Sequence, residues 1–96
     1  MDLAAFRATL HASAPPGAVS LLLQALWWDA KGDWAAAHDC AQADPGPAGS
    51  AVHAYLHRKE PDLANARYWY SRAGRSPATG SLEQEWDALV TELLGA

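Results

Sequence analysis

Hydrophobic residues recur at intervals of three and four along most of the chain, a pattern typical of amphipathic helices. Leu3, Phe6 and Leu10 follow it in a short first segment, and the pair Pro15-Pro16 then ends helical structure. The pattern predicts an all-α fold in a single domain spanning residues 1–96. We expect an N-terminal helix and linker (1–18), a first helical hairpin (19–43), a second helical hairpin (48–74) and a C-terminal helix (81–95).

Turn and capping residues mark the ends of these helices. The first hairpin is expected to close at Lys31-Gly32-Asp33, because glycine suits the left-handed position after a helix and aspartate caps the next one. The second is expected to close at Glu60-Pro61-Asp62, with its first helix beginning at Ser50 or a nearby proline. Ser81 followed by Gln84 predicts a capping box at the start of the last helix.

The two hairpins form an internal repeat. A shift of 29 residues places Ala25, Trp28, Asp33, Trp34 and Ala37 on Ala54, His57, Asp62, Leu63 and Ala66. Small residues at the crossing of two helices and larger ones between units are typical of stacked helical repeats. Because such arrays need about three units to be stable, we expect the first and last helices to complete the core.

These residues resemble the tetratricopeptide repeat, with Ala25, Trp28, Gly32-Asp33-Trp34 and Ala37 at its small, aromatic and turn positions. The segment 65–74 resembles the second helix of the Sel-type variant. Residues 52–74 also resemble a stretch found in a group of short, uncharacterised bacterial proteins. The resemblance implies stacked helical hairpins and carries no activity with it.

Composition and charge narrow the choice of partner. Half of the residues are hydrophobic and five are tryptophan, enough for a compact core. The formal net charge of -4 disfavours nucleic acid as a partner. Residues 58–75 nevertheless carry five basic and two acidic side chains, whereas 81–96 carry four acidic and no basic ones. The two segments are expected either to contact each other or to form separate docking faces.

The sequence favours a cytoplasmic protein that does not enter the membrane. Cys40 is the only cysteine, so no disulfide can form within the chain. The apolar run from Val19 to Trp28 has about half the length of a membrane span. The first residues, with Asp2 and the later prolines, fit a signal peptide poorly.

A candidate metal site lies on the predicted third helix, where His53, His57 and Glu60 share one stripe. Two imidazoles one turn apart hold zinc or copper when a third ligand joins them. In the alternative interpretation, His57 occupies the packing position that matches Trp28, and both histidines hydrogen-bond to a neighbouring helix. We expect no cofactor.

A candidate binding surface lies on the second hairpin, because aromatic and arginine side chains dominate binding hot spots. In the alternative interpretation Trp69 packs on the first hairpin or the last helix, and Arg72 pairs with an acidic residue of the last helix, Glu83, Glu85 or Asp87. The candidate residues are His57, Arg58, Asn65, Tyr68, Trp69 and Arg72.

The sequence gives little support for an enzyme. His38 and Cys40 lie two residues apart and do not face each other on a helix. Asp33 is expected to cap a helix, and Asp29 and Asp39 are expected to be solvated. The leading hypothesis is a module that binds a protein, a peptide or itself through the second hairpin. The alternatives are a protein that binds a small molecule or a metal, and a self-associating structural protein.

Overall fold

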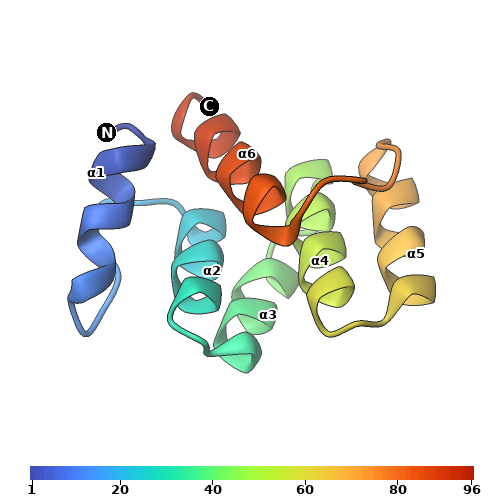
Figure 1. The fold of residues 1–96 in the computed structure, drawn as a ribbon, viewed down its shortest axis with the longest axis horizontal. Coiled ribbons are helices and arrows are strands. Elements are labelled where there is room, and N and C mark those ends of the chain that lie inside the picture. The colour runs from blue at the N-terminus through green and yellow to red at the C-terminus, as the bar shows by residue number, and fades with distance from the viewer.

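The computed structural model describes all 96 residues and contains helices but no strands, which confirms the all-α class. The chain folds into six α-helices and one short 3-10 helix (Figure 1). They are α1 (Leu3–Ala8), η1 (Thr9–His11), α2 (Leu21–Ala30), α3 (Trp34–Gln42), α4 (Pro47–Lys59), α5 (Leu63–Ala73) and α6 (Leu82–Leu94). No helix combines the length and the apolar character needed to cross a membrane.

The helices begin where the capping residues predict. Asp33 accepts a hydrogen bond from the Ala36 amide at the start of α3, and Asp62 accepts one from the Asn65 amide at the start of α5. Ser81 and Gln84 form both bonds of the capping box. Helix α4 begins at Pro47, three residues before Ser50, because proline is favoured in the first turn of a helix, where no amide donor is required.

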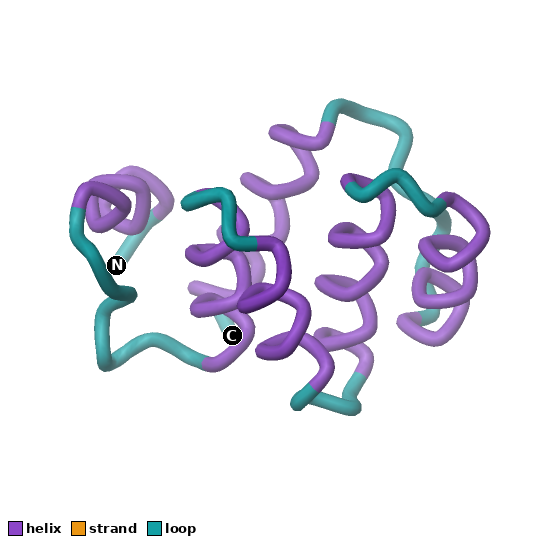
Figure 2. The backbone as a smooth tube through the Cα atoms, turned by 90° about the horizontal axis from the view of Figure 1, so that it is seen from below, coloured by secondary structure: helices purple, strands orange, loops and turns teal.

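Consecutive helices pack as neighbours along the longest axis of the molecule. Helix α2 packs against α3, α3 against α4, and α4 against α5. The equivalent alanines Ala25, Ala37, Ala54 and Ala66 are all buried, and their small side chains let the helices approach closely. Figures 1 and 2 place α1 and α5 at opposite ends of this row, so the outer side of α5 has no neighbouring helix.

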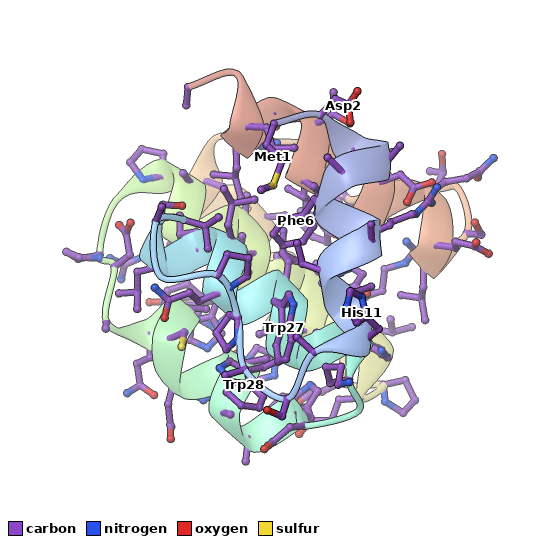
Figure 3. All side chains as sticks on the ribbon, turned by 90° about the vertical axis from the view of Figure 1, so that its left-hand side faces the viewer. Met1, Asp2, Phe6, His11, Trp27 and Trp28 are labelled. Carbon is purple, nitrogen blue, oxygen red and sulfur yellow. The ribbon has the colours of Figure 1, made fainter.

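Helix α6 returns from the end of the row and lies across α2 and α4 (Figure 1). It buries Trp86, whose indole nitrogen donates a 2.9 Å hydrogen bond to the Leu26 carbonyl. Helix α1 packs against α6, and the Phe6 ring lies 6.0 Å from the Trp86 ring. Figure 3 shows Phe6 and Trp27 pointing into the interior beneath α1. The first and last helices thus contribute to the core of the two helix pairs.

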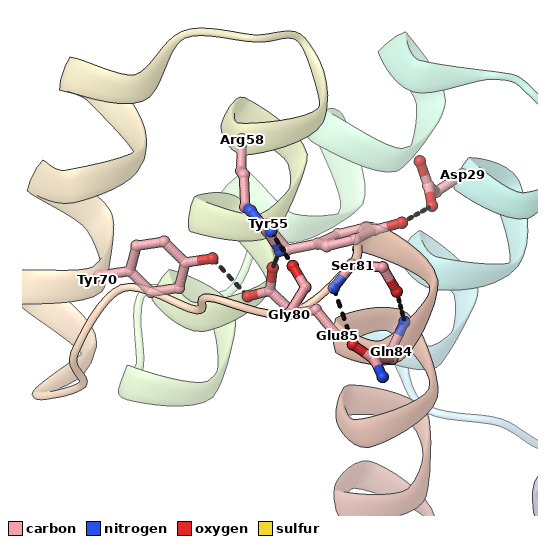
Figure 4. Close-up of polar contacts among 8 residues, drawn as sticks. All are labelled: Asp29, Tyr55, Arg58, Tyr70, Gly80, Ser81, Gln84 and Glu85. Carbon is pink, nitrogen blue, oxygen red and sulfur yellow. Dashed lines mark hydrogen bonds and ion pairs between the residues drawn. The ribbon is translucent and has the colours of Figure 1, made fainter.

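Two basic residues in or next to the second helix pair contact the acidic last helix within the same chain. The Arg58 guanidinium pairs with the Glu85 carboxylate at 2.9 Å, and Arg75 pairs with Glu92. Glu85 also accepts a hydrogen bond from the Tyr70 hydroxyl (Figure 4). The charge pattern was compatible with mutual contact or with separate docking faces, and the structure contains mutual contact.

Asp29 is buried, so the prediction that its side chain is solvated was wrong. Its side chain accepts hydrogen bonds from the Tyr55 hydroxyl at 2.7 Å and from the Lys59 ammonium at 2.9 Å. Figure 4 shows the Tyr55 hydroxyl directed at this carboxylate across the space between α4 and α2. Burial and the bond to Asp29 together raise the pKa of the Tyr55 hydroxyl far above its usual range. Asp29 is therefore a structural tie between α2 and α4.

Candidate functional site: a histidine and tryptophan cluster

Three of the four histidines in the chain lie together where α3 packs against α4. His53 and His57 are one turn apart on α4, and their rings stack 4.8 Å apart. His38 of α3 faces them, and its Nε2 atom lies 2.8 Å from Nε2 of His53. His53 and His57 are buried, and His38 is half-buried. The two helices therefore concentrate three imidazoles in one small volume.

Two tryptophans enclose this group. Trp34 stacks on His38 with 4.9 Å between ring centroids, and its indole nitrogen donates a 2.9 Å hydrogen bond to the Leu56 carbonyl. Trp69, from α5, stacks on His53 at 3.9 Å with the two planes 16° apart. Trp69 therefore packs on the second helix pair itself and covers His53. We name this group of five rings the histidine cluster: His38, His53, His57, Trp34 and Trp69.

Two polar neighbours fix the orientation of His57. Its Nδ1 atom lies 2.9 Å from a carboxylate oxygen of Glu60, and its Nε2 atom lies 3.4 Å from the Asn65 amide nitrogen. The Glu60 carboxylate can only accept a hydrogen bond from Nδ1, and the Asn65 amide nitrogen can only donate one to Nε2. These partners favour the tautomer of neutral imidazole that carries its hydrogen on Nδ1. In this tautomer Nε2 carries no hydrogen, and its lone pair is available as an acceptor or a metal ligand.

Burial disfavours the charged forms of His38 and His53. Burial, with smaller contributions from the neighbouring His38 and His57, lowers the pKa of His53 to about 4. Burial likewise lowers the pKa of His38, with a second contribution from His57. Removing an imidazolium from water is unfavourable, and a second positive charge beside it adds repulsion. Neutral imidazole is the form that accepts hydrogen bonds and binds metals.

An exposed aromatic and basic face adjoins the cluster on the outer side of α5. The Tyr68 side chain is 53% exposed. The Arg72 guanidinium donates a 3.1 Å hydrogen bond to the Tyr68 hydroxyl and lies 5.2 Å from the Trp69 ring centroid. Arg72 thus stacks on the aromatic rings and does not pair with an acidic residue of α6. We name Tyr68 and Arg72 the α5 face. Arg67 is also exposed on α5, where it lines a shallow hollow with Arg58 and Leu63 on the other flank of the helix.

The structure divides the six residues of the predicted binding surface among three places. His57, Asn65 and Trp69 belong to the histidine cluster or contact it, while Tyr68 and Arg72 lie on the α5 face. Arg58 points the other way and is held by Glu85 and the Gly80 carbonyl (Figure 4). It therefore shares no surface with the other five.

His38 is the member of the site that the sequence did not associate with His53 and His57. Fifteen residues separate it from His53, and helical periodicity relates only residues on the same helix. Its one local signal is the position four residues after Trp34, which places the two rings on one face of α3.

Comparison with protein-family models, with curated proteins and with solved structures finds no match to this chain.

Proposed function

We propose that this protein is an interaction module whose α5 face binds an acidic segment of another protein. The observation that supports the proposal is which of the seven basic side chains have a partner within the chain. Arg7, Arg58, Lys59 and Arg75 each pair with a carboxylate of the chain, and Lys31 donates to backbone carbonyls. Arg67 and Arg72 pair with no carboxylate, and both are exposed residues of α5.

The chemistry of this face suits a peptide or helix that carries carboxylates beside an apolar residue. Arg72 supplies charge-assisted donors, and the Tyr68 ring beside it supplies exposed apolar area. Arg67 adds a second unpaired positive charge on the same helix. Arg72 is already held against Tyr68 and Trp69, which reduces the conformational entropy lost when it binds a carboxylate. The position of α5 at the end of the row leaves room for a partner to approach (Figure 1).

The test is selection from a displayed peptide library on the immobilised protein, followed by affinity measurements on the selected peptides. We expect acidic sequences whose affinity falls at least tenfold in the double variant Arg67→Gln/Arg72→Gln and also falls with added salt. The matched control is Gln42→Glu/Thr91→Glu, which makes the same change in net charge at exposed positions of α3 and α6. Selected peptides that bind all three proteins equally would refute the proposal.

A further inference from the structure

We propose that His38, His53 and His57 bind one divalent transition-metal ion, with zinc as the natural occupant. This site is independent of the α5 face, because none of the three imidazoles belongs to that face. It also differs from the set suggested by the sequence: His38 replaces Glu60 as the third ligand. The ion would join α3 to α4 through their side chains.

The separation of the ring nitrogens suits a common ion. One ligand nitrogen from each histidine can be chosen so that all three lie within 4.8 Å of one another. Zinc binds imidazole nitrogen at about 2.0–2.1 Å, which places two nitrogens of a tetrahedral site about 3.3 Å apart. The Nε2 atoms of His38 and His53, now 2.8 Å apart, would separate slightly, and His57 would move toward them. The three imidazole rings would assemble the site by rotating about their side-chain torsions.

Without an ion, the ring-nitrogen lone pairs of the three histidines have few hydrogen-bond donors. In the contact between His38 and His53, two Nε2 atoms share a single hydrogen, so one lone pair is satisfied by the other ring. The Nε2 lone pair of His57 receives only the long 3.4 Å contact from Asn65. A metal ion accepts all three lone pairs at once, after the hydrogen shared by the two Nε2 atoms has moved to Nδ1 of the ring that carries it.

The surroundings resemble those of a prepared site. Glu60 accepts the Nδ1 proton of His57, and a carboxylate on the far nitrogen of a metal-binding histidine orients the ring and raises its basicity. Trp34 and Trp69 hold the His38 and His53 rings by stacking. Half-exposed His38 gives an ion a route from solvent. Three protein ligands leave a fourth position for water or another donor.

The other group of potential ligands is less suitable. His57, Glu60 and Asp62 also offer ligand atoms close together, but both carboxylates are exposed and already have partners. Asp62 accepts the hydrogen bond from the Asn65 backbone amide that caps α5, and Glu60 accepts a hydrogen bond from Nδ1 of His57. Binding an ion there would disrupt a helix cap, whereas the three-histidine set does not involve Asp62 and leaves that cap intact.

The test is titration of chelator-treated protein with Co²⁺, followed by visible absorption, and displacement of Co²⁺ by Zn²⁺. We expect one ion per chain and the intense visible bands of tetrahedral cobalt. His38→Gln should weaken binding at least a hundredfold. His11→Gln, which changes the one histidine outside the cluster, should leave binding unchanged. Glu60→Gln should weaken it about 10- to 100-fold, the effect typical of a residue that orients a ligand.

Each contrary result overturns the proposal in a recognisable way. If His38→Gln binds like the unaltered protein while Glu60→Gln does not bind, the ligands are His53, His57 and Glu60. If His11→Gln weakens binding as much as His38→Gln, the ion is held at surface histidines. If chelator-treated protein takes up neither ion, the cluster is purely structural. Half-exposed His38 is the position of choice because its replacement leaves the core intact, which circular dichroism of the variant checks.

Discussion

The Tyr55 hydroxyl donates a 2.7 Å hydrogen bond to the Asp29 carboxylate and so links α4 to α2. Because the carboxylate is buried, loss of this donor leaves it with Lys59 as its remaining side-chain partner. We predict that Tyr55→Phe lowers the free energy of unfolding by about 1–2 kcal/mol, measured by chemical denaturation. Tyr68→Phe, at an exposed tyrosine, serves as control and should change it by less than about 0.5 kcal/mol. Equal stabilities would show that the bond contributes nothing net.

Gly49 in α4 has no space for a side chain. A Cβ atom added there would lie 2.1 Å from the Asp44 backbone carbonyl oxygen, which cannot move without displacing the loop before α4. We predict that Gly49→Ala destabilises the protein by about 1–3 kcal/mol despite the higher helix propensity of alanine. Gly17→Ala, with no atom within 4 Å of its added Cβ, should be close to neutral. Thermal denaturation of both variants compares them directly.

Stability of the metal-free protein should decrease in acid because of His53. Its pKa is about 4 in the folded chain and 6.5 when unperturbed, so between these values the unfolded chain binds the additional proton. The free energy of unfolding is therefore highest above pH 6.5 and falls toward pH 4, by on the order of 2 kcal/mol. Denaturation in the presence of a chelator measures this slope. His53→Gln removes the titrating group, and an unchanged slope in that variant would assign the effect to other residues.

Removal of residues 81–96 should leave the helix pairs without a packed core. Helix α6 covers buried positions of α2 and α4, and Trp86 itself is 7% exposed. We predict a product that keeps helical far-ultraviolet dichroism, loses near-ultraviolet dichroism, binds hydrophobic dyes and aggregates. Deletion of only Gly95 and Ala96, which are exposed, is the control. A truncated protein that remains monomeric and melts cooperatively would contradict the prediction.

The features that the sequence predicted best depend on residues close together in the chain. The caps at Asp33, Asp62 and Ser81, and the left-handed Gly32 with φ of 86°, each involve a few consecutive residues. The helices themselves follow from a periodicity visible within each segment. Membership of the tetratricopeptide class stays a prediction, because it concerns the relationship of this chain to others.

The features that the sequence did not predict depend on packing between helices. Asp29 looks like a solvated residue at the end of an apolar run, and only the position of α4 supplies Tyr55 and Lys59 as its partners. The sequence predicted part of the histidine cluster, because His53 and His57 lie on one face of a helix. His38 joins them only because α3 packs beside α4. Similarly, Arg58 and Tyr68 differ in exposure because α6 reaches one and not the other.

The contact between α1 and α6 has a consequence for how the protein unfolds. A linear row of helices, in which each element touches only its neighbours, can fray from either end. Here α1 packs against α6, and α6 packs against α2 and α4. The helices at both ends of the chain therefore contact each other and the middle of the row. We expect α1, α2, α4 and α6 to exchange their amide hydrogens as one cooperative unit. Helix α5, which carries the α5 face, lies at the open end of the row and should exchange its amide hydrogens sooner.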